Sequence, residues 1–232
     1  MLEKYVKNVF LGFPDARKYF KEPDKLIDAG NPVRRSFFQM NREDARKKLG
    51  LSRDSFIILS FGGSLGAEKI NEVAFDLMEA INGQPDTMLI FGTGQGYYWE
   101  VLQKARQRGI KIQDNILIKD YIDDMDQYLM ACDLVISRSG ALTVAETTVC
   151  GKAALLIPSP NVTGNHQYYN AKALADKGGA ILIEEKNLTS VQVIDEVIKI
   201  RDNPQLLQAM SQASKSCAPD RALDIIYQTI RG

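Results

Sequence analysis

Apolar residues follow two alternating patterns along the chain. Short runs rich in Val, Ile, Leu and Phe are typical of buried strands, whereas apolar positions that recur every three or four residues indicate amphipathic helices. The runs predict strands over residues 56–61, 88–91, 115–118, 134–137, 153–157 and 180–183. The helical pattern predicts helices over residues 67–81, 97–108, 141–149 and 166–177, and then over 191–201, 204–214 and 221–230.

The alternation of strands and helices predicts the α/β fold class. Strands that are apolar throughout need cover on both faces, so we expect a Rossmann-like parallel sheet flanked by helices, with right-handed crossovers. The last three helices have no strands between them and are expected to wrap this domain. The first 30 residues are less regular. Parallel sheets bind ligands beyond the carboxyl ends of their strands, so the loops that follow the strands are the candidate sites.

The loop between the predicted strand 134–137 and the helix 141–149 has the composition of an anion-binding turn. The first N–H groups of a helix have no intrahelical partner and carry partial positive charge, and Gly140 lets a phosphate approach them without a Cβ in the way. Glu146 follows about one and a half turns into the helix, where it can accept hydrogen bonds from two ribose hydroxyls or simply face solvent. Phosphate donors beside a sugar-binding acid predict a nucleotide site.

Two glycine-rich loops follow earlier predicted strands. Residues 62–67 open a helix after the strand 56–61, as a diphosphate-binding turn does, although a plain tight turn has the same pattern. Residues 92–96 begin like a dinucleotide-binding fingerprint, but Tyr97 stands where the third glycine is required, and a flexible rim loop fits equally well. An NAD-dependent oxidoreductase is therefore an alternative that the sequence disfavours.

The loop at residues 121–125 offers a surface for a nucleotide base. Tyr121 and Ile122 can wall a flat ring, and the backbone of Ile122 can pair with the edge of a pyrimidine, although both residues also fit a core. Asp123 and Asp124 are interpreted as capping and first-turn acids of a helix rather than as catalytic carboxylates.

A polar loop at residues 158–165 leads into the predicted helix 166–177. His166, Gln167 and Asn170 share one face of that helix and can reach a sugar or a phosphate. His166 is the only histidine of the chain and is either structural or a hydrogen-bond donor to a ligand. No acid nearby in the sequence would orient it as a general base.

Composition narrows the classes of partner. Lys and Arg together number 29, as do Asp and Glu, so no basic excess favours a nucleic acid or an anionic membrane surface. The candidate cations for a phosphate are Arg34, Arg138 and Lys152, and Arg34 is preferred because a proline-containing turn fixes its backbone. Three widely spaced cysteines and the lack of a long apolar segment lead us to expect a soluble, cytoplasmic protein without a metal site.

Five motifs, in order over residues 13–232, resemble the carboxyl-terminal half of the MurG family. They are Gly30–Arg34, Gly62–Ala67, Tyr121–Met125, Arg138–Glu146 and His166–Ala171. MurG proteins are peptidoglycan glycosyltransferases that move N-acetylglucosamine from UDP-N-acetylglucosamine to undecaprenyl-diphosphoryl-N-acetylmuramoyl-pentapeptide. The resemblance implies the carboxyl-terminal domain of a GT-B glycosyltransferase, in which two Rossmann-like domains face each other across a cleft.

The resemblance also implies roles for individual residues. The backbone of Ile122 would meet uracil, Glu146 would hold the ribose hydroxyls, and Ser64 would bind the diphosphate. The diphosphate would also contact the start of the next helix at Ala141, Leu142 and Thr143. Neither a metal nor a cofactor is implied, because helix dipoles and polar side chains neutralise the leaving UDP in this family.

The other implied contacts concern the sugar. Gln167 and Asn170 would reach the hydroxyl groups of N-acetylglucosamine, and Arg34 would lie near the cleft. His166 stands where some family members carry another polar residue, so the resemblance gives it no fixed role.

The resemblance implies that residues 21–232 are the UDP-sugar-binding domain and residues 1–20 a linker or a remnant of an amino-terminal domain. That domain, or a partner chain, would supply the lipid acceptor site, the membrane contact and the general base. The implied enzyme is an inverting hexosyltransferase of lipid II synthesis at the cytoplasmic face of the inner membrane, with roles in cell-wall biogenesis, cell shape and cell division. A non-catalytic UDP-sugar-binding subunit is the main alternative, and a UDP-N-acetylglucosamine epimerase is disfavoured.

Overall fold

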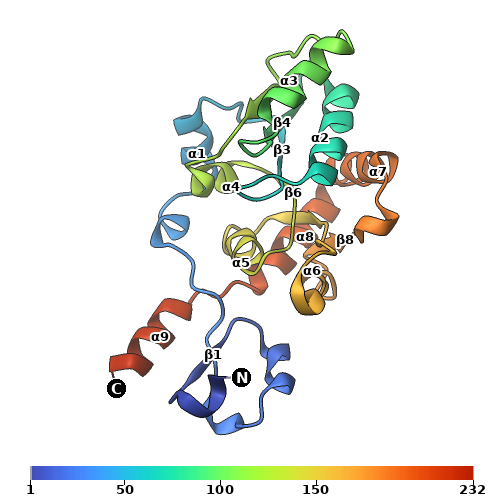
Figure 1. The fold of residues 1–232 in the computed structure, drawn as a ribbon. Coiled ribbons are helices and arrows are strands. Elements are labelled where there is room, and N and C mark those ends of the chain that lie inside the picture. The colour runs from blue at the N-terminus through green and yellow to red at the C-terminus, as the bar shows by residue number, and fades with distance from the viewer. Residues whose placement is uncertain (1, 232) are drawn as a thin grey trace.

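The computed structural model describes residues 2–231, and most of them form one parallel sheet with helices on both faces (Figure 1). Within the described residues this sheet has six strands in the order β5-β4-β3-β6-β7-β8, and every neighbouring pair is parallel. The strands are β3 (Phe56–Phe61), β4 (Thr87–Gly92), β5 (Ile116–Lys119), β6 (Leu134–Ser137), β7 (Ala153–Leu156) and β8 (Ala180–Leu182). The predicted fold class and all the predicted strands are confirmed, with shifts of a single residue at most at their ends.

The direction in which strands are added changes between β3 and β6. The chain runs outward from β3 through β4 to β5, returns, and runs outward the other way through β6, β7 and β8. At the carboxyl end of the central pair, Phe61 of β3 lies opposite Ser137 of β6. Loops that leave the two strands on either side of such a switch point diverge, and a crevice forms between them.

Helices cover both faces of the sheet. One face is covered by α2 (Glu68–Ile81), α3 (Tyr98–Gln107) and α7 (Ser190–Arg201). The other face is covered by α4 (Met125–Ala131), α5 (Ala141–Val149) and α6 (His166–Ala175). Apart from α4, for which no helix range was predicted, these elements confirm the predicted helices to within two residues at each end, and they place the start of α5 beside the crevice.

Three further helices lie outside these two layers. They are α1 (Arg42–Leu49), which packs on α4, α8 (Pro204–Ser216), which contacts α5 and β7, and α9 (Ala222–Arg231). The expectation that the last three helices wrap the domain holds for α7 and α8. It is wrong for α9, which extends away from the sheet and buries only Ala222 (Figure 1).

Residues 2–30 form a small unit beside the sheet. In it β1 (Val9–Leu11) pairs in parallel with β2 (Leu26–Asp28), and short 3-10 helices connect them. The boundary expected between residues 20 and 21 falls inside this unit, because the pair takes one strand from each side of it. Figure 1 shows α9 at the same end of the molecule as this unit.

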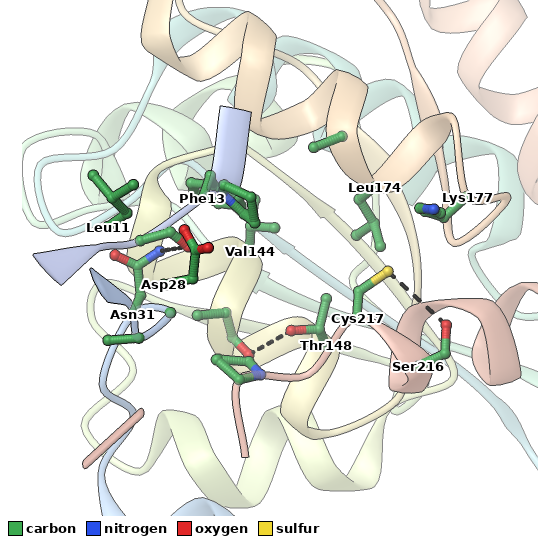
Figure 2. Close-up of a pocket in the computed structure, with 17 residues that line it drawn as sticks. Leu11, Phe13, Asp28, Asn31, Val144, Thr148, Leu174, Lys177, Ser216 and Cys217 are labelled. Carbon is green, nitrogen blue, oxygen red and sulfur yellow. Dashed lines mark hydrogen bonds between the residues drawn. The ribbon is translucent and has the colours of Figure 1, made fainter. Parts of the chain in front are cut away.

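A cavity of about 390 Å³ lies between the small unit and the helices α5, α6 and α8 (Figure 2). Leu11 and Phe13 line it from the small unit, and Val144 and Leu174 line it from α5 and α6. Its walls are mainly apolar, and none of the ten residues predicted to bind a ligand is among those that line it.

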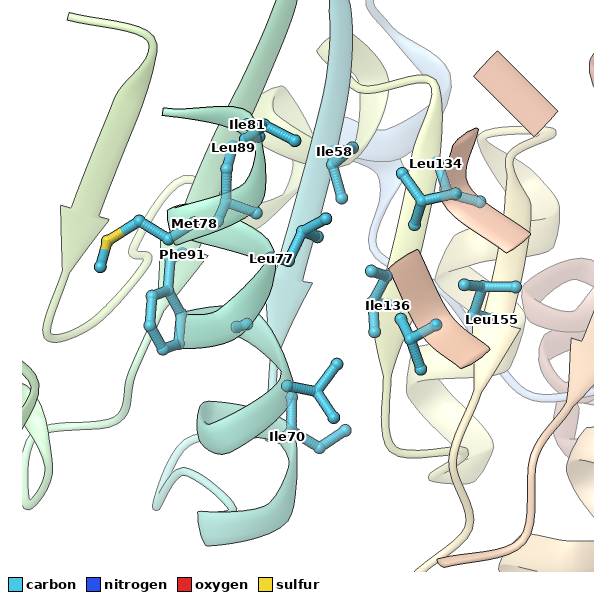
Figure 3. Packing of buried hydrophobic residues seen from close by; sticks show 14 of the residues in the cluster. Ile58, Ile70, Leu77, Met78, Ile81, Leu89, Phe91, Leu134, Ile136 and Leu155 are labelled. Carbon is cyan, nitrogen blue, oxygen red and sulfur yellow. The ribbon is translucent and has the colours of Figure 1, made fainter. Parts of the chain in front are cut away.

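The core between the sheet and α2 shows why the strands are apolar throughout. Ile58 of β3 and Ile136 of β6 pack with Ile70 and Leu77 of α2 on one face (Figure 3). Val135, the neighbour of Ile136 in the chain, belongs to the core on the opposite face. Because successive residues of a strand point to opposite faces, a sheet that is covered on both sides needs apolar residues at every position.

A buried ion pair holds the amino ends of the central strands β3 and β6 in place. The guanidinium of Arg46 in α1 contacts the carboxylate of Asp133 at 2.7 Å and also donates to the carbonyl oxygens of Ala131 and Ser55. The same carboxylate accepts a hydrogen bond of 2.8 Å from the N–H of Ile57 in β3. Arg46 is only 2% exposed, so α1, β3 and the segment before β6 are joined through one desolvated charge pair.

We expect Arg46→Ala to lower the free energy of unfolding by about 3–5 kcal/mol, because it removes the buried cation of Asp133, leaves only the half-exposed Arg42 beside that carboxylate, and takes the donors away from buried carbonyl oxygens. Urea unfolding followed by circular dichroism measures the loss. Arg53→Ala is the matched control: Arg53 pairs with Glu43 at the surface, and we expect a change within about 0.5 kcal/mol. Equal losses in the two variants would contradict the role of the buried network.

We expect Cys217 to be the only one of the three cysteines that reacts with a thiol reagent in the folded protein. Cys132 and Cys150 are buried, and burial raises the pKa of each thiol to about 12, so neither forms the reactive thiolate near neutral pH. Titration with a chromogenic disulfide should detect one thiol in the folded chain and all three after denaturation. A fast-reacting thiol in the folded Cys217→Ser variant would show that a second cysteine is accessible.

Candidate functional site

A cleft of about 350 Å³ opens at the carboxyl ends of the central strands. It lies at the switch point, where the loops after β3, β4, β5 and β6 meet. Half of the residues predicted to bind a ligand line this cleft, namely Arg34, Ser64, Ile122, Thr143 and Glu146. They belong to segments far apart in the sequence, so it is the parallel sheet that brings them together.

The first turn of α5 offers backbone donors to the cleft. Its N-cap is Gly140, which has no side chain to cap the turn, and no acidic residue occupies the first turn. Among the described residues nothing accepts a hydrogen bond from the N–H groups of Ala141, Leu142 and Thr143, and the first N–H of the helix to be paired is that of Val144, which donates to Gly140 at 3.0 Å. Unpaired N–H groups at the positive end of a helix dipole form an anion-binding site.

Glu146 and Arg34 place opposite charges in the cleft. Burial raises the pKa of Glu146, the positive charge of Arg34 opposes that rise, and the nearby Asp126 adds to it. The guanidinium of Arg34 lies 5.4 Å from the centre of the Phe37 ring, a contact that fixes its position. The cleft therefore contains a partly desolvated carboxylate, which is a strong hydrogen-bond acceptor, and one cation.

The turn after β3 presents Ser64 to the cleft and is held by backbone packing. Gly66 and Gly94 both have positive φ, of 78° and 84°, and a Cβ on Gly94 would overlap the backbone nitrogen of Gly66. Asn71 of α2 also donates to the carbonyl of Thr93 at 2.9 Å. Gly94 therefore serves the close packing of the two loops, which is a third role besides the dinucleotide fingerprint and the flexible loop considered from the sequence.

Ile122 combines a buried side chain with a free backbone. The residue is 6% exposed, and in the described part of the chain its N–H and C=O have no hydrogen-bond partner. Tyr121 lines the same wall, and Asp120 accepts a hydrogen bond of 2.8 Å from the N–H of Tyr121. Asp120 was not predicted as a site residue, and the only signal in the sequence is its place directly after the strand β5.

The two acids after Ile122 differ in position. Asp123 lines the cleft, whereas Asp124 occupies the N-cap of α4. The interpretation of Asp124 as a capping residue is confirmed for its position, but its side chain accepts no capping hydrogen bond.

The residues predicted at the start of α6 do not line the cleft. They lie after the next strand of the sheet, and part of each amide side chain is used within the fold. The Gln167 side-chain carbonyl accepts a hydrogen bond of 2.9 Å from the N–H of Ser159, and the Asn170 amide donates to the Ser139 carbonyl at 3.0 Å. The exposed ring of His166 has its Nδ1 2.8 Å from a carbonyl oxygen of the preceding loop.

Two of the three candidate cations have structural partners instead of facing the cleft. Arg138 donates to two carbonyl oxygens of the loop after β7 and pairs with Glu185. Lys152 is buried, burial lowers its pKa, and its amino group donates to the Met130 carbonyl at 2.7 Å. Arg34 alone of these three candidate cations lines the cleft, and its role toward a phosphate stays a prediction.

The geometry of the cleft agrees with the comparison with known families. Residues 57–225 match the glycosyltransferase family 28 C-terminal domain. The chain belongs to this family. The matched span of the family 28 domain runs from β3 into α9 and therefore contains Ser64, Ile122, all of α5 and the start of α6.

Relatives of this family 28 domain carry the name expected from the resemblance. The chain is 38% identical over 231 residues to a UDP-N-acetylglucosamine--N-acetylmuramyl-(pentapeptide) pyrophosphoryl-undecaprenol N-acetylglucosamine transferase of Acetivibrio thermocellus, covering 100% of this chain and 62% of that protein. The protein of the same name from Desulforudis audaxviator is 38% identical over 232 residues, with 99% and 62% covered. The chain thus spans about 62% of the length of these curated relatives.

Solved structures show the same fold. The crystal structure of Acinetobacter baumannii MurG superposes with a TM-score of 0.72 at 26% identity, covering 100% of this chain and 63% of that one. A putative UDP-N-acetylglucosamine 2-epimerase from Listeria monocytogenes gives a TM-score of 0.74 at 18% identity, covering 99% of this chain and 60% of that one, which shows a shared fold only. The resemblance to the carboxyl-terminal half of MurG and the GT-B fold class are therefore confirmed.

Between residues 2 and 231 no helix has both the length and the apolar character needed to cross a bilayer. Nor do three or more His, Cys, Asp or Glu side chains gather there in a way that could hold a metal ion.

Proposed function

We propose that this protein is the UDP-N-acetylglucosamine-binding part of an inverting N-acetylglucosaminyltransferase of peptidoglycan synthesis. The observation that carries the proposal is the uncapped start of α5, which shares one cleft with Glu146 and with the free backbone of Ile122. Together these groups offer partners for a diphosphate, a ribose and a base. The names of the relatives supply the sugar and the reaction.

Each part of UDP has a partner in this proposal. Uracil pairs with the backbone of Ile122, the ribose hydroxyls donate to Glu146, and the diphosphate lies between Ser64 and the first turn of α5. An acceptor hydroxyl attacks the anomeric carbon with inversion, the bond from that carbon to UDP breaks, and negative charge grows on the diphosphate. The unpaired N–H groups of α5 are already oriented toward that charge and stabilise it without reorganisation, and Arg34 adds a positive charge. Neither a metal nor a cofactor takes part.

The acceptor side of the reaction is proposed to lie outside this sequence. The relatives are longer than the chain, and we assign the lipid acceptor site, the membrane contact and the general base to an amino-terminal domain or to a partner chain. The reaction would then take place at the cytoplasmic face of the inner membrane, and it would serve cell-wall biogenesis, cell shape and cell division. A non-catalytic UDP-sugar-binding subunit would use the same cleft without turnover.

Calorimetric titration tests the proposed ligand. We expect saturable binding of UDP and of UDP-N-acetylglucosamine, no comparable binding of NADH, and affinity for UDP about tenfold lower in Glu146→Ala, because hydrogen bonds to a charged acceptor are lost. Asp195→Ala is the matched control, since Asp195 is an exposed acid on α7 far from the cleft. Absence of UDP binding, or tighter binding of NADH, would refute the proposed function.

The affinity for UDP-N-acetylglucosamine should fall as the pH is lowered from about 7 to 5. Ribose hydroxyls donate to the ionised form of Glu146, and because burial raises the pKa of this carboxyl, protonation removes the acceptor closer to neutral pH than for an ordinary glutamate. The nucleotide sugar is the probe because its substituted diphosphate does not titrate in this range. Glu146→Gln should bind more weakly and without this pH dependence, so an equal dependence in both proteins would exclude Glu146 as its source.

A further inference from the structure

Ser139 joins the start of α5, which faces the cleft, to the start of α6. It is fully buried and directly precedes Gly140, the N-cap of α5. Its hydroxyl donates to the backbone carbonyl of Gln167 at 2.8 Å, and its own carbonyl accepts from the Asn170 amide at 3.0 Å. Two hydrogen bonds of opposite direction therefore hold the first turn of α6 against the turn that leads into α5.

The start of α6 depends on such tertiary contacts. The chain enters the helix through Gly164 and Asn165, both in the left-handed region with φ of 65° and 51°. Asn165 occupies the N-cap, but its side chain makes no capping hydrogen bond. A helix start without a cap, reached through a backbone conformation that L residues rarely adopt, has little local stabilisation of its own.

The contacts also determine which atoms of the amide side chains are left for a ligand. One lone pair of the Gln167 side-chain carbonyl is taken by the N–H of Ser159, so both N–H donors and the second lone pair remain for a ligand. Asn170 donates one N–H to Ser139, while in the described residues its carbonyl oxygen receives no hydrogen bond, so Asn170 keeps its acceptor and its second N–H. This distribution of donors and acceptors exists only while α6 keeps its present position relative to Ser139.

We propose that Ser139 is a positioning residue that sets how much the sugar contributes to the affinity for a nucleotide sugar. The inference rests on the proposed function, in which UDP lies against α5, Ile122 and Glu146, and on the sugar contacts that the family resemblance implies for Gln167 and Asn170. Removing the Ser139 hydroxyl leaves its carbonyl, and hence the bond from Asn170, in place. The start of α5 should therefore keep its position, while the first turn of α6 loses the bond to Gln167.

The test compares UDP with UDP-N-acetylglucosamine in Ser139→Ala. We expect the nucleotide sugar to bind about fivefold to tenfold more weakly than to the unmodified chain, the effect of losing one buried hydrogen bond, and UDP to bind within about twofold of its original affinity. Retained UDP binding also shows that the variant is folded. A proportional loss for both ligands would overturn the proposal, because it would mean that Ser139 supports the fold in general.

Two serine variants calibrate the result. Ser64→Ala should weaken both ligands to the same extent, because Ser64 is placed on the diphosphate that they share. Ser159→Ala should change neither, because its hydroxyl makes only a 3.4 Å contact with the N–H of Asn161 and the N–H that binds Gln167 is retained. A selective loss for the nucleotide sugar in Ser159→Ala would move the positioning role away from Ser139.

Hydrogen exchange supplies a readout that needs no ligand. Amides in the first two turns of α6 should exchange at least about threefold faster in Ser139→Ala than in the unmodified chain, while those of α2 keep their rates. Unchanged exchange in α6 would overturn the positioning role. If the unmodified chain binds neither ligand, the proposed function fails; if it binds both and Ser139→Ala keeps their affinity ratio, only the role of Ser139 fails.

Discussion

The cleft depends on the turn between β6 and α5. Side chains of this turn make hydrogen bonds within the fold, whereas the first backbone N–H groups that follow it make none in the described residues. Arg138 and Ser139 donate to the loop after β7 and to α6, and Arg138 also pairs with an acid beyond β8. The N–H groups at the start of α5, the helix that follows, have no partner among the described residues. A helix start can stay open toward a ligand only when neighbouring contacts fix its position, so the internal network and the anion site are two sides of one arrangement.

The amino and carboxyl ends of the strands differ in how their polar groups are satisfied. At the amino ends of the strands, every nitrogen of the buried Arg46 guanidinium donates a hydrogen bond within the protein. Toward the carboxyl ends of the strands, the hydroxyls of Ser60 and Ser137 are fully buried and have no hydrogen-bond partner in the described residues. In the same region α5 begins after Gly140 without a side-chain cap. A capping side chain typically adds about 1 kcal/mol, so the carboxyl ends of the strands, where the proposed site lies, give up stability that the amino ends retain.

The parts of the fold that could be predicted from the sequence are those whose burial produces a recognisable pattern of apolar residues. The strands β3 to β8 are buried on both faces, and uninterrupted apolar runs reveal them. The pattern does not reveal α1, because that helix is mostly charged and packs through Ala45 and Arg46, where the buried charge looks like a surface residue. Nor does it reveal β1 and β2, which are three residues long and too short to show a period.

Prediction of the site has a similar limit, which concerns the atoms that each residue leaves available to a ligand. The open helix start at the strand-to-helix junction could be predicted, because it depends on backbone geometry that Gly140 and its neighbours impose locally. Arg34, Arg138 and Lys152 carry the same charge, so the sequence does not separate them. In the structure Arg138 and Lys152 donate hydrogen bonds to backbone carbonyl oxygens of distant segments. The side chain of Gln167 can turn either its oxygen or its N–H groups toward a ligand until the hydrogen bond from the N–H of Ser159 fixes its orientation. Residue types therefore indicate what a site can bind, and contacts between remote segments decide which atoms remain to bind it.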